Sequence, residues 1–593
     1  MYDYFKKLLF ILPAKRSSLF YMALLFLMTS IVEVIGIGIV GPFIALATNP
    51  SFIDKYSALS WAFTHSPFTD ENYFLAILGV LVAIAFCFKA FVSWFTQASI
   101  VRFSDKQQRL IIVRLVREYL FAPYVYHTLK NSSSIVDSVI EIASTFTMSV
   151  LSPLLSTLSN ILVASALLIL LYVTSPSTIL ILLLTLTPVF LFFNSFKAKV
   201  KRWGKQVRTS KESIIRTINH SFGGIKETKI IGCESFFEHQ VELQAVKLEH
   251  AHGDFAAFKM LPRFVVEAVM VTVILSIVSV SLLLSNGAVE NLTSVLGIYA
   301  LASIRMLPAI SNSIAGVNQL RNTSYTVNQI YTELRGLEET TSDLNPSGSQ
   351  TTAQSKMQFD RQVDLKDLVY RYPSASEDSL KGVSLTLNKG ESIAFIGKSG
   401  AGKTTLVDII LGLLEPQFGD LLVDGHSIFQ DRRGWQNLVG YIPQSIFLMD
   451  ETLERNIAFG VPDHLIDSER MMRAIAAAQL KEVVDGLPEG IHTKVGERGV
   501  LLSGGQRQRV GIARALYHER EILILDEATA ALDNETERLV TESIKELSGK
   551  KTIITIAHRL STIKHCDRIY LLERGSIVKS GSYHEVVCDT TLA

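Results

Sequence analysis

The sequence predicts two consecutive domains of different class, an all-α domain that spans a membrane six times and then an α/β domain built on a mainly parallel sheet. Two observations predict this division. The first half of the chain contains apolar stretches of about 20 residues, the length that a helix needs to cross a bilayer. From about residue 357 onward, short β-rich runs alternate with helical patterns. Because 593 residues are too many for one core, two or more domains are expected.

Six apolar segments form the predicted transmembrane domain, residues 1–340. They are residues 19–47, 74–100, 142–172, 177–196, 264–285 and 293–318. The turn signal Thr174-Ser175-Pro176-Ser177 makes the third and fourth segments an antiparallel hairpin. Residues 341–356 are polar and rich in Ser, Thr and Gly, so we assign them to a linker. The second domain then comprises residues 357–593.

The distribution of Lys and Arg predicts the orientation of the chain in the membrane. The leader and the segments after the second and fourth helices are rich in both residues. In the opposite loops, 48–73, 173–177 and 286–292, Lys55 is the only Lys or Arg. Both termini are therefore expected in the cytoplasm. The two long basic segments are expected to project from the membrane. Each is broken where a short cross-helix, near 124–131 and 224–232, would contact the second domain.

Composition excludes several classes of function. The formal net charge of +1 gives no general attraction to nucleic acid. The four cysteines form no C-x-x-C pair, so neither a metal site nor a disulfide framework is expected. The first apolar run is long enough to remain in the bilayer, so no removable signal peptide is expected. In loop 48–73, aromatic residues at helical spacing fit either an interfacial amphipathic helix or an irregular loop.

One stretch of the second domain, residues 397–405, has the pattern of a phosphate-binding loop. An apolar run precedes it and a helical run follows it, which is the order of strand, turn and helix that such a loop needs. The glycines let backbone N–H groups surround a phosphate, and the helix N-terminus adds partial positive charge. Lys403 would reach the β- and γ-phosphates, and the Thr404 hydroxyl would bind Mg²⁺. The alternative, a glycine-rich turn without a ligand, is disfavoured by the complete pattern.

Further motifs follow this loop in a fixed order. Gln444 ends a predicted strand, where its amide can sense Mg²⁺ and the attacking water. Ser503 begins a helix whose N-terminus offers a second anion site. A buried strand ends in Asp526, which suits the metal's outer shell, and in Glu527, which suits the polarisation of water. Another strand leads to His558, which is placed to contact a γ-phosphate.

With these motifs in this order, the chain resembles the ABC transporter superfamily over nearly its whole length. The resemblance implies an ATPase coupled to transport, with ATP and Mg²⁺ as cofactors. It assigns catalysis to Glu527 as general base, to His558 as switch histidine and to Gln444, and metal binding to Thr404, Gln444 and Asp526. The nucleotide-binding residues that it implies are Tyr372 (stacked on adenine), Gly397, Ser399, Gly400, Ala401, Gly402, Lys403, Thr404, Thr405, Ser503, Gly504, Gly505, Gln506 and Asp533. Residues 493–499 match the loop that contacts the membrane domain in this family.

The resemblance also implies a dimer. In this family the signature sequence of one subunit, here residues 503–506, closes on the ATP that the other subunit holds. This chain contains one phosphate-binding loop and one signature, which implies a homodimer or a heterodimer with a similar chain. Six helices followed by one ATPase domain are similar to bacterial exporters. We therefore expect an integral protein of the bacterial plasma (inner) membrane.

Charged residues inside the predicted helices bear on the substrate. Glu33, Lys89, Glu267 and Arg305 fall within spans and Arg263 lies at the edge of one, where an unpaired charge is costly. One interpretation is internal pairing, for example of Glu33 with a cation of another helix. The other is a cavity lined by Lys89, Arg263 and Arg305 that attracts an anionic substrate.

A narrower resemblance also concerns the substrate. Segments of the first, fifth and sixth helices look like those of flippases for lipid-linked oligosaccharides and of related polysaccharide exporters. This implies outward movement of an anionic lipid-linked oligosaccharide or a related glycolipid. Asn312 stands where the sixth helix of that group often has a second Arg. A multidrug or lipid A-type exporter is therefore an alternative. A nucleotide-gated channel or regulatory membrane ATPase is another, which Glu527 and the intact signature disfavour.

Overall fold

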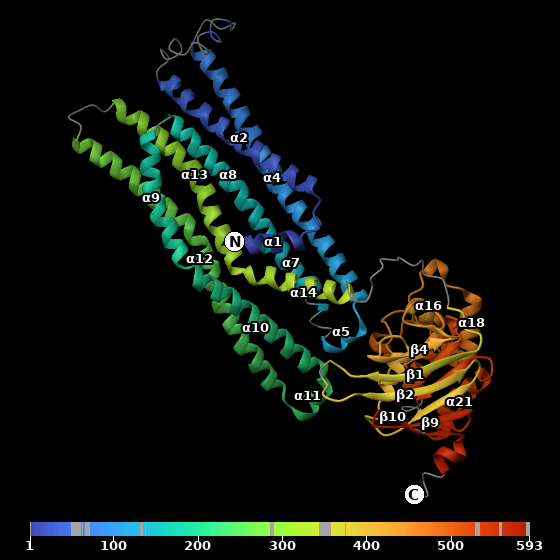
Figure 1. Cartoon of the computed structure of the whole chain (residues 1–593). Coiled ribbons are helices and arrows are strands. Elements are labelled where there is room, and N and C mark those ends of the chain that lie inside the picture. Colours follow the sequence, from blue (N-terminus) through green and yellow to red (C-terminus); the bar gives the residue numbers. More distant parts are fainter. Residues whose placement is uncertain are drawn as a thin grey trace. The chain divides into compact units, whose positions relative to one another are not determined.

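The computed structural model is shown in Figure 1. It describes residues 2–48, 61, 63, 65, 71–130, 135–136, 138–174, 176–284, 290–342, 357–373, 375–527, 534–556 and 560–588. The chain divides into two compact units, one of Met1–Ala122 with Leu129–Pro346 and one of Pro123–Thr128 with Ser347–Ala593. The first unit is helical, and the second combines helices with two sheets. The predicted helix or loop within residues 48–73 lies mostly outside the described residues.

Long helices dominate the first unit. Its elements are α1 (Tyr2–Ile11), α2 (Arg16–Thr48), α4 (Glu71–Phe121), η2 (Ser138–Ile142), α7 (Ala143–Phe146), η3 (Thr147–Leu151), α8 (Ser152–Thr174), α9 (Pro176–Ser195), α10 (Lys197–Gly223), α11 (Ile225–Ile231), α12 (Glu234–Leu284), α13 (Glu290–Asn322) and α14 (Ser324–Ser342). Within the described residues, three segments are long and apolar enough to cross a membrane: Arg16–Gly36, Tyr73–Phe121 and Ser138–Leu170. Helices α9, α12 and α13 overlap the other three predicted spans.

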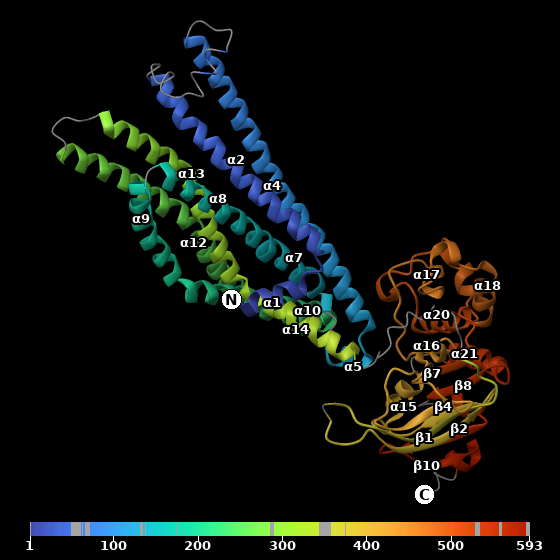
Figure 2. The same ribbon diagram turned by 45° about the horizontal axis from the view of Figure 1, so that its top comes forward.

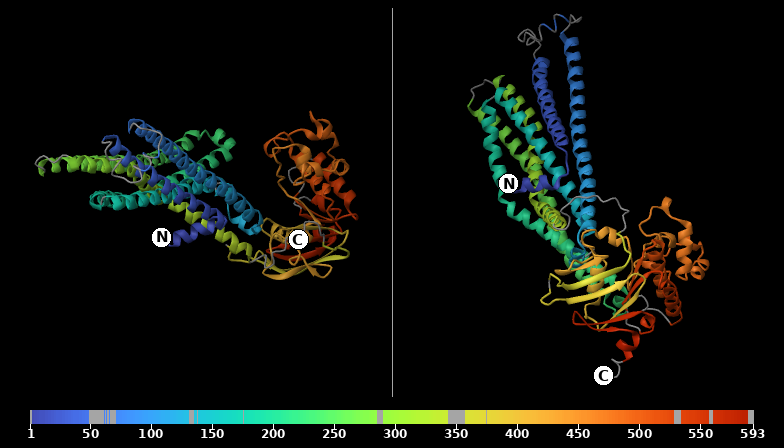
Figure 3. Two further views of the ribbon diagram at one scale, coloured as in Figure 1. Left: turned by 90° about the horizontal axis from the view of Figure 1, so that it is seen from above. Right: turned by 45° about the vertical axis from the view of Figure 1, so that its right-hand side comes forward.

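Polar contacts join α2 and α4, which run side by side in every view (Figures 1 and 3). The Thr29 and Thr96 hydroxyl oxygens lie 2.6 Å apart. The Ser93 hydroxyl donates to Glu33 at 3.4 Å. Such bonds are favoured inside apolar surroundings, because a buried polar group without a partner costs free energy. The two helices therefore form a specifically registered antiparallel pair.

A second cluster packs α10 and α12 against the end of α13. Its aromatic centre includes Phe258, whose ring lies 5.7 Å from that of Phe193 and 5.8 Å from that of Trp203. Gly204 allows the close approach of α10 to α13, because a Cβ atom there would lie 2.0 Å from the backbone oxygen of Asn322. A larger residue at position 204 would therefore push the two helices apart.

Two sheets form the centre of the second unit. One has the strand order β2-β1-β4-β5 and the other the order β10-β9-β3-β8-β7-β6. The strands are β1 (Gln362–Tyr370), β2 (Leu380–Asn388), β3 (Ser392–Ile396), β4 (Phe418–Val423), β5 (His426–Ser427), β6 (Val439–Ile442), β7 (Ile522–Asp526), β8 (Thr552–Ile556), β9 (Arg568–Glu573) and β10 (Ser576–Gly581). In the larger sheet the pairs β9-β3, β3-β8, β8-β7 and β7-β6 are parallel. The predicted α/β class with a mainly parallel sheet is confirmed for this unit.

The helices of this unit cover two separate cores. They are α5 (Tyr124–Leu129), α15 (Lys403–Ile410), α16 (Arg432–Gln436), α17 (Leu453–Ile457), η4 (Asp463–Leu465), α18 (Ser468–Ala477), α19 (Lys481–Asp485), η5 (Gly490–His492), η6 (Glu497–Gly499), α20 (Gly504–Tyr517), α21 (Asn534–Leu547), α22 (Leu560–Ile563) and η7 (His584–Cys588). One core surrounds α15 and the fully buried Trp435. The other joins α17, α18 and α20, which lie together in Figure 2.

Candidate active site

Three of the predicted ATP-site motifs, the glycine-rich loop, Gln444 and Asp526-Glu527, meet at one edge of the six-stranded sheet. Strands β3, β7 and β6 are parallel, so their carboxyl ends share that edge. Ile396 ends β3 directly before the glycine-rich loop, and Asp526 ends β7. Gln444 follows the end of β6 by two residues. The sheet therefore brings together three motifs that are widely separated in the sequence.

The geometry of the glycine-rich loop requires glycine at two positions. Gly397 has φ of 151° and Gly402 has φ of 100°, values that side chains rarely adopt. A Cβ atom at Gly397 would lie 2.3 Å from the backbone oxygen of Leu572, and one at Gly402 would lie 2.7 Å from that of Ser379. These two glycines thus permit the turn that leads from β3 into α15. Gly400, at φ of 80°, faces open space.

Lys403 lies within its own loop. Its Nζ donates to the backbone oxygens of Gly397 at 2.7 Å and of Lys398 at 3.1 Å. Burial lowers the pKa of Lys403, while the charges of Glu527 and Asp526 raise it. The next residue, Thr404, is exposed at the start of α15. The ammonium group therefore sits where an anion bound in this loop would meet it.

Two carboxylates at the end of β7 have distinct partners. The Tyr441 hydroxyl donates to Asp526 Oδ2 at 3.1 Å. The Gln444 amide donates to Glu527 Oε2 at 2.5 Å. Glu527 has φ of 49°, in the left-handed region that a glutamate seldom occupies. Such strain is typical of functional sites. The structure thus brings the predicted Gln444 and Glu527 together.

Magnesium would find suitable donors here. Hard cations such as Mg²⁺ prefer oxygen ligands, and near nucleotides they use one or two protein groups together with phosphate oxygens. The exposed Thr404 hydroxyl, the Gln444 amide oxygen and the Asp526 carboxylate are donors of that kind. The residues present therefore fit the predicted ion.

Two residues near this edge were not predicted as part of the site, Tyr441 and Asp408. Burial and the charge of Asp526 raise the pKa of Asp408 to about 6. Burial and the charge of Asp526 also raise the pKa of Tyr441. A lone acid in the apolar run of α15 was the sequence signal for Asp408. For Tyr441 the signal was its place three residues before Gln444.

Tyr372, the predicted adenine-stacking residue, is half-buried two residues after the end of β1. Its ring meets that of Tyr370 edge-on, with centroids 5.1 Å apart. Its hydroxyl lies 3.4 Å from Thr405 Oγ1. The side chain is therefore positioned beside the first turn of α15, close to the glycine-rich loop. Stacking on adenine stays a prediction.

The predicted signature begins α20 through a capping box. The Ser503 hydroxyl accepts from the backbone N–H of Gln506 at 3.2 Å, and the Gln506 side chain accepts from the backbone N–H of Ser503 at 2.8 Å. This arrangement fixes the N-terminal turn of α20, including Gly504 and Gly505. Ser399 and Ala401 lie in the loop of β3, whereas the signature helix packs in the other core. Asp533 and His558 lie outside the described residues.

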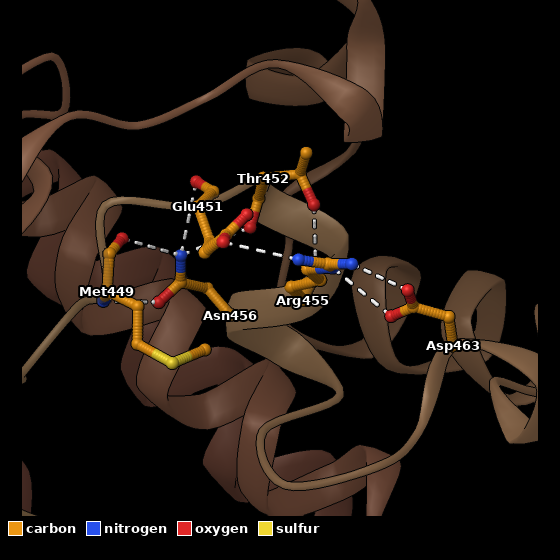
Figure 4. A network of polar contacts seen from close by, with 6 residues as sticks. All are labelled: Met449, Glu451, Thr452, Arg455, Asn456 and Asp463. Carbon is orange, nitrogen blue, oxygen red and sulfur yellow. Dashed lines mark hydrogen bonds and ion pairs between the residues drawn. The ribbon is translucent and has the colours of Figure 1, made fainter. Parts of the chain in front are cut away.

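A polar network holds the segment that follows Gln444 (Figure 4). The fully buried Asn456 accepts from Met449 N at 2.9 Å and donates to Met449 O at 3.1 Å and Thr452 O at 3.1 Å. Arg455 pairs with Glu451 at 3.2 Å and with Asp463 at 2.5 Å. These hydrogen bonds and ion pairs hold the segment 449–463 in one backbone conformation.

The same segment is joined to the predicted membrane-contact loop, residues 493–499. Leu453 N donates to Thr493 O at 3.0 Å, and Val495 N donates to Glu451 O at 3.1 Å. Beyond that loop, Arg507 of α20 donates to Leu502 O at 2.9 Å. Because Leu501 N also donates to Val495 O at 3.2 Å, hydrogen bonds connect the loop after Gln444 with the helix that begins at the signature.

The structure contains short helices at both predicted cross-helix positions. Helix α5 groups with the second unit, and Val125 packs against the core around α15. Burial and the charge of Asp408 raise the pKa of Tyr124, so α5 lies near the nucleotide edge. Helix α11 belongs to the helical unit and exposes Ile230 and Ile231, at 86% and 73% of their surface. These exposed apolar side chains make α11 suitable for contact with another protein surface.

The three predicted cavity cations have different surroundings. Lys89 Nζ lies 2.6 Å from Glu33 Oε2, and the Lys89 side chain is 6% exposed, which favours internal pairing over a cavity role. Arg263 is exposed on α12 and forms no ion pair within the described part of the chain. The side chain of Arg305 lies outside the described residues. Within the described residues, the charge of Arg263 therefore remains available.

A pocket of about 950 Å³ lies among α10, α12, α13, α14 and the segment 141–149. Charged side chains of both signs line it, together with amides, hydroxyls and Phe255. Lys211 and Glu141 in its wall pair at 3.0 Å. Lys259 also lines it, four residues before Arg263 on the same face of α12. Arg263 therefore lies one helical turn beyond the pocket lining on α12.

Comparison with known proteins decides the family. A family profile described as ABC transporter matches residues 380–530. The chain is 32% identical over 477 residues to the ATP-dependent lipid A-core flippase of Cupriavidus metallidurans, with 79% of this chain and 77% of that protein covered. The chain is an ABC transporter. The transporter is an integral membrane exporter that binds ATP and couples its hydrolysis to translocation.

Two further comparisons extend this result. The transporter is 42% identical over 226 residues, 38% of its length and 39% of the other chain, to YgaD of Bacillus subtilis, a protein named for multidrug export. A solved structure of a bacterial Atm1-family ABC exporter with ATP bound has the same fold, with a TM-score of 0.73 at 20% identity, covering 97% of this chain and 96% of that one. The predicted fold class and the resemblance to ABC transporters are thus confirmed.

Proposed function

We propose that this transporter moves an anionic glycolipid from the cytoplasmic to the outer leaflet of a bacterial plasma membrane. The observation that carries the proposal is the 32% identity over 477 residues with a protein named as a lipid A-core flippase. An alignment of that length extends well beyond the ATPase domain into the membrane helices. A lipid-linked oligosaccharide belongs to the same chemical class, because it too joins an apolar anchor to phosphate and sugars.

The helical unit has side chains suited to such a headgroup. Arg263 offers a positive charge without an internal partner in the described residues, and a charge at the edge of a membrane span is costly unless it meets water or an anion. The pocket lined by Lys259 of the same helix offers Gln319, Gln329 and Thr326, whose amides and hydroxyl can bond to sugar hydroxyls. The apolar anchor would remain in the bilayer.

The ATPase unit supplies the driving step. We infer that Lys403 exchanges its bonds to the loop oxygens of Gly397 and Lys398 for phosphate oxygens when ATP binds. Glu527 then accepts a proton from the attacking water, while Gln444 holds the carboxylate in place. Bound Mg²⁺ would neutralise phosphate charge. The signature at the start of α20 would act on the ATP of a second copy of this chain.

Substrate-stimulated ATPase activity in proteoliposomes tests the proposal. We expect stimulation by a lipid A-core glycolipid or by a lipid-linked oligosaccharide, and little by neutral drugs. Arg263→Gln should reduce this stimulation and leave the basal rate unchanged. Lys247→Gln, which removes an exposed charge from the cytoplasmic part of the same helix, is the matched control. Equal stimulation of wild type and Arg263→Gln would contradict the proposed role of Arg263.

Multidrug export is the second candidate, and the similarity to YgaD favours it. A drug exporter would respond to apolar cations, which Arg263 would repel. Strong stimulation by such drugs, with none by glycolipids of either type, would therefore replace the glycolipid proposal with this one.

A further inference from the structure

We propose that the cytoplasmic end of the α2–α4 pair binds the phosphate headgroup of an anionic glycerophospholipid. A pocket of about 350 Å³ opens there. It is lined by Ser17, Ser18, Tyr21, Met22, Ser99, Arg102 and Phe103. The site is separate from the proposed substrate path and from the ATP site, and its existence does not depend on either proposal.

The position of this pocket relative to the bilayer follows from the sequence. Ser17 and Ser18 directly precede the first apolar segment, and Arg102 directly follows the second. Both helix ends are on the basic side that the distribution of Lys and Arg assigns to the cytoplasm. The pocket therefore lies at the level of the cytoplasmic headgroups, where the leaflet surface is negative.

The polar groups of this pocket have no competing partners. Arg102 makes no ion pair, and the hydroxyls of Ser17, Ser18 and Ser99 make no hydrogen bond, with any residue that the structure describes. A guanidinium group and hydroxyl donors together match the oxygens of a phosphate. Among the described residues, no amide side chain of the kind that would favour sugar lines the pocket, so a phospholipid headgroup fits better than a glycan.

Buried apolar side chains form the floor of the pocket, and exposed apolar side chains continue from it along α2. Met22 and Phe103 are buried, at 3% and 9% exposure. The Thr29–Thr96 contact above them fixes the spacing of the two helices. Exposed side chains then follow α2 at helical spacing, namely Tyr21, Leu24, Met28, Ile31 and Ile35. An acyl chain attached to a headgroup in the pocket would lie along this stripe.

Native mass spectrometry of the full-length protein tests the proposal. Dioleoylphosphatidylglycerol and dioleoylphosphatidylcholine would be titrated separately into wild type and variants. We expect the first molecule of phosphatidylglycerol that binds to have an affinity about five-fold higher than the first molecule of phosphatidylcholine. This ratio corresponds to about 1 kcal/mol, the contribution of one basic side chain near an anionic surface. Arg102→Gln should remove this difference. Arg109→Gln, which removes an exposed charge nearer to the C-terminal end of α4, should preserve the difference between the two lipids.

A second variant distinguishes lipid binding in the pocket from a general electrostatic attraction of anionic lipids to the protein. Ser99→Leu fills the pocket and keeps Arg102, and it should abolish the preference for phosphatidylglycerol as Arg102→Gln does. A photoreactive phosphatidylglycerol should label residues 17–22 and 99–103 of wild type, which tests the site even where a variant fails to fold. Equal binding of the two lipids, or equal loss in Arg102→Gln and Arg109→Gln, would overturn the proposal. Displacement by millimolar inorganic phosphate would overturn the lipid assignment in favour of a soluble anion.

Discussion

At the residue scale, the contact between Gln444 and Glu527 assigns each a distinct task. Glu527 needs an ionised oxygen to accept a proton, whereas Gln444 can donate a hydrogen bond in any state of the reaction. The left-handed backbone of Glu527, with φ of 49°, is maintained by its N–H bond to Ile556 O at 3.0 Å. The end of strand β8 therefore holds the backbone from which the Glu527 carboxylate reaches Gln444.

This geometry gives a prediction for Glu527→Gln. The amide keeps the size of the side chain but cannot accept a proton, so ATP hydrolysis should fall about 10²–10⁴-fold. ATP binding should be retained, since Lys403 and its loop are unchanged. Equilibrium binding and single-turnover hydrolysis of radiolabelled ATP measure the two effects. Glu482→Gln, on the exposed surface of α19, is the control. Normal turnover by Glu527→Gln would exclude Glu527 as general base.

Asp408 gives a second prediction, on pH dependence. Its folded-state pKa of about 6 lies above the ordinary value of 3.8, so the folded state binds the proton more tightly. The free energy of unfolding should consequently fall as the pH rises from 3.8 to about 6. Asp408→Asn removes this penalty and should gain about 1 kcal/mol above pH 6, a figure discounted for solvent screening. Below pH 4 the gain should vanish.

Thermal unfolding of Asp408→Asn across this pH range, without nucleotide, checks the prediction. The exposed Asp485→Asn serves as control. A gain that grew toward low pH would show that the Asp408 carboxylate is stabilised as an anion, contrary to the expectation.

At the scale of elements, the ion pair between Lys89 and Glu33 fixes the register in which α2 packs against α4. The sequence allowed Lys89 to line a cavity or to pair internally. A distance of 2.6 Å to Glu33, with Lys89 6% exposed, favours pairing. Removal of one partner of a buried pair leaves an uncompensated charge, which costs about 3–5 kcal/mol.

Lys89→Met should therefore lower the unfolding temperature of the protein in detergent strongly. Adding Glu33→Gln should restore most of the loss, because neither charge then remains buried. Fluorescence-detected unfolding of the two single variants and the double variant measures this coupling. A stable Lys89→Met protein that lost only substrate-stimulated ATPase activity would instead support the cavity role.

The ATP-site motifs could be predicted from the sequence because most of them lie at or near the end of an apolar strand or at the start of a helix, and their roles stay predictions. The sequence did not predict Tyr441 as a partner of Asp526, since that contact depends on the pairing of β6 with β7, in which Tyr441 lies opposite Ile524. Nor did it predict the burial of Asp408, which depends on packing between distant segments. Local patterns specify elements and motifs, whereas contacts between elements require the three-dimensional register.

At the scale of the whole molecule, one transporter chain has one glycine-rich loop and one signature helix, and they lie in separate cores. The glycine-rich loop belongs to the core around α15, and the signature helix α20 belongs to the other core. The family resemblance implies that the two meet only across a dimer, which we propose for this chain. Closed symmetry would then generate two equivalent sites from one pair of surfaces.

Complementation between variants tests this dimer. In a Glu527→Gln background, homodimers of Lys403→Ala or of Ser503→Ala have no ATP site intact on both faces. A mixed dimer has one site in which both defects meet and one that combines an intact loop with an intact signature. We therefore expect differently tagged mixed dimers to retain about one ATP after rapid gel filtration, and either parent dimer almost none. Light scattering in the same samples verifies the dimeric state. Retention no higher in mixed dimers than in the parents would mean that each chain closes its own site, and the dimer would then have to be explained by the membrane helices alone.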